Sequence, residues 1–301
     1  MKKIKYFYIA LLILILMNES IIAGETGGQP GAFLRRGVGS SALAMGNAYT
    51  SVASDASALY WNPAGISEIK QRELFGMFSV LTFDRQQVFL SFGYNFSDLF
   101  SAAIGWNKFG VNNIDGRDAV GNSTEKFNDS ENSIMLALSK QFGIISVGIT
   151  GKYLNHSLFD KSATGFGFDV GMRARFLEMI NIGLVIQDVA SQLKWNTQSG
   201  LEEKIPLNVR GGVSFQPSFL SGIASVELSK VGENDLVFRV GAEYRIVEFF
   251  GIRVGYDGDN ISFGGMVKPP FDLLNFQLDY AATRDVLVAG YVHHITLKFE
   301  F

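Results

Sequence analysis

The side chains of residues 165–176 alternate strictly between two kinds, and this pattern limits what the chain can fold into. The apolar set is Phe166, Phe168, Val170, Met172, Ala174 and Phe176. The other set is Gly165, Gly167, Asp169, Gly171, Arg173 and Arg175. A period of two is typical of a β-strand whose faces meet different surroundings. Residues 236–246 repeat it, with Arg239, Glu243 and Arg245 on the polar face.

The apolar content points to a membrane, but not to helices. Hydrophobic residues make up 47% of the chain, yet after residue 23 no apolar run approaches the ~18 residues that a spanning helix needs. Backbone groups in lipid must be hydrogen-bonded internally, which leaves a closed barrel. A soluble β-sandwich also alternates, but charges with glycines on one face suit a hydrated lumen. We therefore predict a transmembrane β-barrel.

The N-terminus has the order of a secretory signal peptide. Lys2, Lys3 and Lys5 precede an apolar run over residues 6–17, and a polar patch follows up to Ala23. The apolar run is shorter than the ~20 residues needed to cross a bilayer. We predict a signal peptide over residues 1–23.

Charge, cysteine and histidine content exclude several classes. The net charge of −3 and the dispersed Lys and Arg residues argue against a nucleic-acid partner, and there is no Cys for a disulfide or thiolate site. We expect His293 on the lipid face, His294 on the lumen face and His156 in a loop. Asp257 and Asp259 predict a tight turn rather than a calcium site. We predict no catalytic residues, no cofactor and no metal.

Fourteen strands can be counted, joined alternately by short turns and mostly longer stretches. The strands are expected at 73–82, 86–96, 99–109, 132–141, 143–154, 164–176, 179–189, 205–216, 219–229, 236–246, 249–257, 260–267, 272–281 and 291–301. The longer stretches are 110–131, 155–163, 190–204, 230–235 and 282–290. Short turns are periplasmic in such barrels, so we expect both termini in the periplasm.

The last strand alternates up to a terminal aromatic residue. Phe299 and Phe301 share a face with Leu297 and Ile295. This ending resembles the C-terminal signal by which outer-membrane barrels are recognised for assembly. We therefore predict the barrel assembly machinery and outer-membrane lipids as partners.

Residues 31–70 do not alternate and are rich in Gly, Ala and Ser. Ser54 and Asp55 are expected to cap a short helical turn that Pro63 stops. We predict that residues 24–70 form a plug that enters the lumen from the periplasm, and that residues 71–301 form the barrel. The expected packing residues of the plug are Met45, Gly46, Asp55, Tyr60 and Trp61.

Three stretches of this segment carry a family resemblance: residues 42–46 (Ala-Leu-Ala-Met-Gly), 53–57 (Ala-Ser-Asp-Ala-Ser) and 60–66 (Tyr-Trp-Asn-Pro-Ala-Gly-Ile). They resemble the N-terminal hallmark of the PorV/PorQ proteins and their FadL relatives, which are fourteen-stranded outer-membrane barrels. The resemblance covers about 40 residues of the chain. It implies a plug motif at Asn62, Pro63, Ala64 and Gly65, either a hinge or a turn that leads into the first strand.

The two branches of this resemblance imply different functions. Residues 34–40 (Leu-Arg-Arg-Gly-Val-Gly-Ser) and 55–65 (Asp-Ala-Ser-Ala-Leu-Tyr-Trp-Asn-Pro-Ala-Gly) favour the PorV/PorQ branch. That branch implies a non-enzymatic barrel that assists protein secretion or surface export with type IX-like components. The alternative is FadL-like transport of long-chain fatty acids or other hydrophobic small molecules, and a third is a general porin. The chain is short for either branch. For the lumenal charges we expect an ion-paired lining rather than a selectivity filter, formed by Asp169, Arg173, Arg175, Arg239, Glu243 and Arg245.

Overall fold

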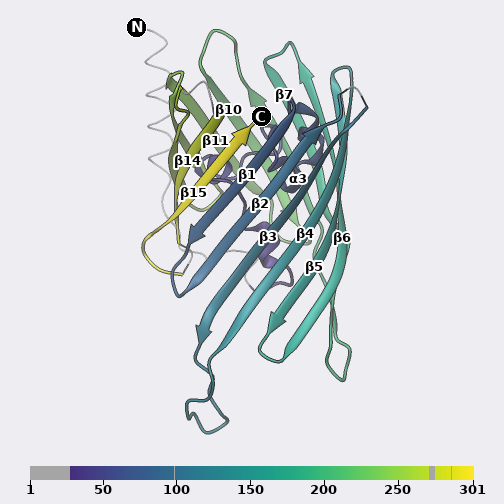
Figure 1. Cartoon of the computed structure of the whole chain (residues 1–301), viewed down its shortest axis with the longest axis vertical. Helices are drawn as coiled ribbons and strands as arrows, with labels where there is room; N and C mark the ends of the chain where they lie inside the picture. The colour runs from purple at the N-terminus through teal and green to yellow at the C-terminus, as the bar shows by residue number, and fades with distance from the viewer. Residues whose placement is uncertain (1–27, 98, 271–274, 286) are drawn as a thin grey trace.

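The computed structural model describes residues 28–97, 99–270, 275–285 and 287–301, so the predicted signal peptide lies outside it. The chain forms a closed antiparallel β-barrel (Figure 1), in which each long strand pairs with two neighbours and the β1–β15 and β6–β7 pairings complete the ring. The predicted fourteen-stranded barrel is confirmed. Its long strands are β1 (Arg72–Val80), β2 (Arg85–Asn95), β3 (Ser101–Ile114), β4 (Phe127–Phe142), β5 (Ile145–Leu158), β6 (Lys161–Phe176), β7 (Ile180–Trp195), β9 (Asn208–Phe215), β10 (Gly222–Val231), β11 (Val237–Val247), β12 (Phe250–Tyr256), β13 (Ile261–Val267), β14 (Asn275–Arg284) and β15 (Tyr291–Glu300).

The barrel wall is taller on one side. Strands β3 to β7, called the tall wall below, have 14 to 16 residues, whereas the other long strands have 7 to 11. A fifteenth, short strand that was not predicted, β8 (Glu202–Lys204), pairs with β7. The predicted loop 155–163 is wrong, because only Phe159 and Asp160 separate β5 from β6 and His156 is part of β5. The physical reason is that backbone hydrogen bonds between β5 and β6 continue through these polar residues. Hydrophobic alternation, from which the strand ends were predicted, does not mark such polar stretches.

The two ends of the barrel differ. Arg72 and Phe301 exchange backbone hydrogen bonds of 3.2 and 3.1 Å at one end, called the C-terminal end. Tight turns lie at this end, such as residues 143–144 between β4 and β5. The opposite end, called the loop end, carries residues 115–126 between β3 and β4.

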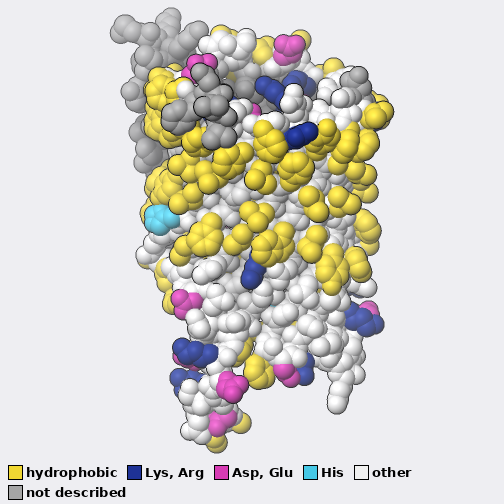
Figure 2. Space-filling model, viewed as in Figure 1, with side chains coloured by type: hydrophobic (Ala, Val, Ile, Leu, Met, Phe, Trp, Pro, Cys, Tyr) yellow, Lys and Arg dark blue, Asp and Glu magenta, His cyan; other side chains and the backbone are white. Residues whose placement is uncertain are grey.

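The distribution of side chains is inverted relative to a soluble protein. Phe166 is 64% exposed and Leu136 60% exposed on the outer face, whereas Asp169 is 1% exposed on the inner face. Figure 2 shows the hydrophobic side chains as a broad belt across the visible face of the barrel, with few charges in it and a more polar zone at the loop end. An apolar belt of this extent on a closed barrel fits a lipid environment. The soluble sandwich is excluded by the closed ring of strands.

The outer surface also bears out the expected faces of the last strand. His293 is exposed and its Nδ1 lies 2.7 Å from the hydroxyl of Tyr280, whereas His294 is buried at 3% exposure. Phe299 packs against Phe276 with a centroid distance of 6.0 Å, and Phe301 is 59% exposed.

The N-terminal segment lies within the barrel. It contains η1 (Ala32–Arg35), α2 (Ser40–Ala44), α3 (Ala58–Trp61) and η2 (Pro63–Glu68); α2 contacts β13 and β14, and η2 contacts β4 and β5. In the described residues no helix is long and apolar enough to cross a membrane. Helix α3 begins at Ala58, later than predicted, and Ser54 does not cap it. Instead Asp55 Oδ1 accepts hydrogen bonds from the backbone N and Oγ of Ser57 at 3.0 and 2.6 Å.

The described part of this segment runs through the barrel. Gln29 Nε2 donates a 3.4 Å hydrogen bond to Asn234, in the connection between β10 and β11 at the loop end, while Arg72 begins β1 at the C-terminal end. Residues 29–71 therefore run from the loop end to the C-terminal end. The physical reason for this path is that Phe33 and Leu34 are buried in an apolar cluster of the barrel near the loop end. The predicted position of the N-terminus itself lies outside the described residues.

Candidate functional site

Side chains of the barrel hold the backbone of the N-terminal segment. Thr296 on β15 accepts from Ser40 N at 2.9 Å, and Glu227 on β10 accepts from Thr50 N at 2.8 Å. On a third part of the ring, Thr150 on β5 donates to Leu59 O at 2.9 Å. Buried backbone groups need such partners. Residues 40–68 are thus fixed to the wall at three places spaced around the barrel.

Glycines on the inner face make room for this segment. A Cβ at Gly255 would lie 2.1 Å from the backbone N of Gly46 and 2.1 Å from the carbonyl carbon of Met45. A Cβ at Gly148 would lie 2.4 Å from the carbonyl carbon of Pro63. Because these are backbone atoms, any larger residue would displace the segment. The packing residues Tyr60 and Trp61 are also buried, and their rings meet edge to face with centroids 5.0 Å apart.

The motif of Asn62, Pro63, Ala64 and Gly65 is fully buried. Asn62 Nδ2 donates to Thr50 O at 3.0 Å and to Met172 O at 3.1 Å, and its Oδ1 accepts from Ala64 N at 3.2 Å. A Cβ on Gly65 would lie 2.1 Å from the carbonyl oxygen of Ala53. Through Asn62 the motif connects the turn at Thr50 and the turn at Ala64 to strand β6.

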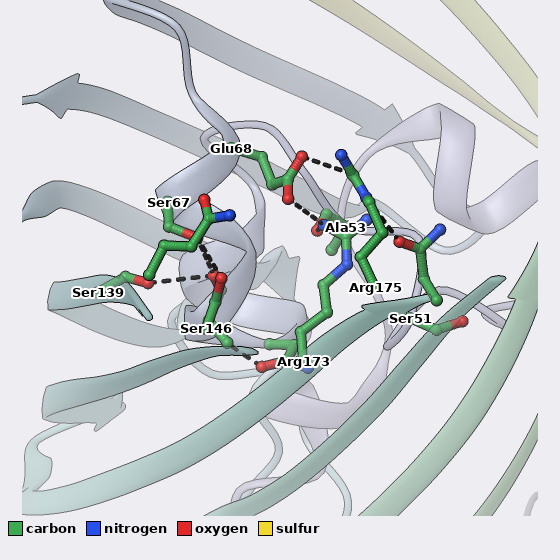
Figure 3. A network of polar contacts seen from close by, with 12 residues as sticks. Ser51, Ala53, Ser67, Glu68, Ser139, Ser146, Arg173 and Arg175 are labelled. Atoms are coloured by element: carbon green, nitrogen blue, oxygen red, sulfur yellow. Dashed lines mark hydrogen bonds and ion pairs between the residues drawn. The ribbon is translucent and has the colours of Figure 1, made fainter. Parts of the chain in front are cut away.

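A polar network continues from this motif to the C-terminal end (Figure 3). Arg175 on β6 donates to Glu68 at 2.6 Å, and Arg173 donates to Ala53 O at 3.0 Å. Ser67 donates to Ser146 at 2.9 Å. Both arginines thus bind the N-terminal segment.

Several of the other lining charges form ion pairs. Arg253, which sequence reasoning missed, binds Glu243 at 2.7 Å and Asp279 at 2.6 Å. Lys152, also missed, binds Asp169 at 2.6 Å. Among the remaining predicted residues, Arg245 binds Glu243 at 3.2 Å with its side chain 51% exposed, and Arg239 donates to Ser229. Asp169 and Glu243 are therefore ion-paired, whereas the contact described for Arg239 is a hydrogen bond to a hydroxyl.

A cavity at the C-terminal end has a mostly polar lining. It has a volume of about 510 Å³ and is lined by charged residues that include Glu73, Lys298 and Glu300. Apolar ligands need mostly hydrophobic walls. This cavity therefore does not fit an apolar ligand.

An apolar cluster instead lies on the inner face of the tall wall, near the loop end. The strand register places the wall residues of this cluster in two rows of inner-face residues, which cross five neighbouring strands and also contain polar side chains. The row nearer the loop end is Phe109, Glu131, His156, Ala163 and Trp195. The second row is Asn107, Ser133, Leu154, Gly165 and Leu193. We call these two rows the tall-wall site.

Residues 32–36, called the cover segment, close this site. Phe33 and Leu34 are 3% and 6% exposed and pack with Leu154, Ala163, Leu193 and Ile205. Tyr60 fixes the inner end of the segment, since its hydroxyl donates to Leu34 O at 2.7 Å and accepts from Gly37 N at 2.9 Å. Burial raises the pKa of Tyr60 to about 12, so the hydroxyl stays protonated at neutral pH.

The cover segment also brings two cations to the site. The guanidinium of Arg36 lies 4.8 Å from the centroid of the Phe109 ring, a cation–π geometry. Burial lowers the pKa of Arg36, and repulsion from Arg85 adds to this effect. Arg35 Nη2 donates to Pro30 O at 3.2 Å, a bond within its own stretch of chain.

Unsatisfied polar groups lie under the cover segment. Asn107 and Ser133 are both 0% exposed, and in the described part of the chain Asn107 Nδ2 and Ser133 Oγ have no hydrogen-bond partner. Buried polar groups without partners are rare in proteins and point to a bound molecule or water. No sequence signal marked this site, since it results from register across five strands.

Solved structures share this fold. The first is the toluene transporter TodX of P. putida, at 12% identity, a TM-score of 0.66 and coverage of 88% of this chain and 99% of that chain. The second is the CymD monoaromatic hydrocarbon channel, at 15% identity, a TM-score of 0.60 and coverage of 88% and 98%. A FadL homologue of Pseudomonas aeruginosa follows at 11% identity, a TM-score of 0.58 and coverage of 88% and 98%.

These likenesses show that the chain shares the barrel fold of these structures. No protein-family model matches the sequence, and no curated protein matches it significantly. At identities of 11–15% the similarity extends to the fold alone.

Proposed function

We propose that this chain is a non-enzymatic outer-membrane barrel that takes up hydrophobic small molecules through the tall-wall site. The observation that carries the proposal is a second, smaller apolar cluster, separate from the one that buries residues 38–69; it lies beside the loop end and is covered by only a few residues. The neighbours described as a toluene transporter and a monoaromatic hydrocarbon channel support the same class of ligand.

The cover segment is the part of the N-terminal segment best suited to move. Residues 40–68 are fixed by barrel side chains and by glycine contacts, as described for Thr296 and Gly255. Toward the barrel, residues 28–36 make one side-chain hydrogen bond among the bonds described, the 3.4 Å contact of Gln29 with Asn234. A hydrophobic ligand that replaces Phe33 and Leu34 therefore breaks few polar bonds to the barrel, and within the N-terminal segment it breaks the bond from Tyr60 to Leu34 O.

The orientation of the barrel follows from its two ends. Short turns at the C-terminal end favour a periplasmic position for that end, and the loop end then faces outward. On this proposal the signal peptide covers residues 1–23, the plug is residues 24–70, and the barrel is residues 71–301. Phe299 and Phe301 serve as the assembly signal.

The secretion role of the PorV/PorQ branch stays a prediction. Two-residue connections such as 159–160 offer little surface to a protein client. A diffusion porin is disfavoured because the N-terminal segment occupies the lumen and is bonded to the wall at β5, β10 and β15.

Ligand binding to the purified barrel tests the proposal. Butylbenzene is titrated into the protein in nonionic maltoside micelles, with empty micelles as the blank. Leu193, 2% exposed in the cluster, is replaced in Leu193→Glu, and Val120→Glu at an 83% exposed loop position is the matched control. We expect binding to the wild type and to the control but not to Leu193→Glu.

Assembly of each variant is checked by its different mobility in boiled and unboiled SDS samples. Two results contradict the proposal: no binding to the assembled wild type, or equal binding to assembled Leu193→Glu.

A further inference from the structure

The cover segment combines apolar side chains with a positive charge, as a hydrophobic cation does. Phe33 and Leu34 supply an apolar body that fills the cluster, and Arg36 places its charge over the face of Phe109 at 4.8 Å. Recognition of a cation on an aromatic face is a general binding mode for organic ammonium groups. The segment therefore occupies the site as an internal ligand would.

The wall beneath Arg36 offers a carboxylate with weak pairing. Glu131 is the direct cross-strand neighbour of Phe109, and in the described residues its one basic partner within 4.0 Å is His156 Nδ1, at 4.0 Å. The nearby acids are better satisfied. Asp129 lies 2.7 Å from His156 Nε2, Glu203 accepts from Trp195 Nε1 at 2.9 Å, and Asp188 pairs with Lys152. Without the cover segment, Glu131 is thus the carboxylate of the tall-wall site that most needs a cation.

A neutral acceptor lies on the same strand. Ser133 is two residues from Glu131 on the inner face of β4, opposite Leu154 of the apolar cluster, and its buried Oγ has no partner in the described part of the chain. A protonated amine is a pure donor that can use Glu131 and Ser133 together. A carboxylate ligand would instead meet the charge of Glu131 at close range.

We infer that the tall-wall site takes hydrophobic cations, which are molecules with an apolar body and a protonated amine, and that Arg36 with Phe33 and Leu34 is their internal substitute. The inference rests on the proposed function and names the substrate class of the same site. When such a molecule is bound, its amine lies between the Phe109 ring and Glu131, and its apolar body takes the place of Phe33 and Leu34.

Three probes with the same apolar body and different charge test this inference. They are 4-phenylbutylamine, butylbenzene and 4-phenylbutyrate, titrated into the full-length barrel in nonionic maltoside micelles with empty-micelle blanks. We expect the amine to bind about tenfold more tightly than butylbenzene, as a desolvated cation–π contact and an ion pair imply. The butyrate is expected to bind least tightly.

Variants identify the groups responsible. Glu131→Gln is expected to reduce the amine's affinity to that of butylbenzene, whereas Glu125→Gln, on the exposed 115–126 connection, is expected to change nothing. Arg36→Gln removes the competing cation and is expected to raise the amine's affinity. Should Glu131→Gln fail to assemble, Phe109→Leu keeps an apolar side chain and is expected to lower the preference for the amine.

The outcomes separate the inference from the proposed function. Butylbenzene binding without preference for the amine, or a preference that survives both Glu131→Gln and Phe109→Leu, refutes the inference and leaves the proposed function standing. Failure of every probe to bind the assembled wild type overturns both.

Discussion

The competition between the cover segment and a ligand can be tested by shortening one side chain. Phe33 is 3% exposed in the apolar cluster, although it lies in a stretch with few polar bonds to the barrel. The variant Phe33→Ala removes most of the apolar surface that holds the cover segment closed. Residues 40–68 keep their own bonds to the wall, so the barrel itself is expected to assemble.

The size of the effect follows from the burial. Complete burial of a Phe side chain contributes about 1.5–3 kcal/mol. A loss of about 2 kcal/mol from the closed state multiplies the open fraction about 30-fold, since 1.4 kcal/mol corresponds to a factor of ten. When only the open form binds, the apparent Kd falls by the same factor as long as that form remains the minor one.

Butylbenzene titration of the assembled protein measures this change. We expect the apparent Kd of Phe33→Ala to be about 30-fold lower than that of the wild type. Phe83→Ala, at a 65% exposed turn position, is the matched control and is expected to leave the Kd unchanged. An unchanged or weakened affinity in Phe33→Ala would refute the reasoning, because Phe33 would then form part of the site rather than compete for it.

Three further predictions concern the N-terminal segment and its fixation. A disulfide in Ser40→Cys/Thr296→Cys, at side chains whose oxygens are 2.9 Å apart, is expected to leave butylbenzene binding unchanged; loss of binding on oxidation, reversed on reduction, would show that residues 40–68 must move. Gly255→Val is expected to lower the yield of heat-modifiable barrel, because its Cβ meets backbone at 2.1 Å, while Gly290→Val, with open space around it, assembles normally. Arg253→Ala leaves the buried Asp279 without its cation and Glu243 with the half-exposed Arg245 alone, so a stability loss of about 3–5 kcal/mol is expected, measured as a lower temperature of conversion to the unfolded band; an unchanged temperature would contradict the pairing.

The structure of the N-terminal segment could be predicted from the sequence only in part. Composition predicted a compact piece near Met45 and Trp61, and both residues are buried. Its direction could not be predicted, since small residues pack equally well from either end of a lumen. The apolar cluster at Leu154 and Leu193, formed by strands far apart from residue 33 in sequence, decides that the segment begins at the loop end.

The sequence by itself determined the barrel. Alternation with a period of two separates a lipid face from a lumen face, and it located all fourteen long strands because lipid and water impose opposite requirements on neighbouring residues. The tall-wall site and the pairing of Arg253 with Asp279 depend instead on which residues lie opposite each other across strands. Only the tertiary structure sets that register, because closing the ring requires every strand to shift relative to its neighbours.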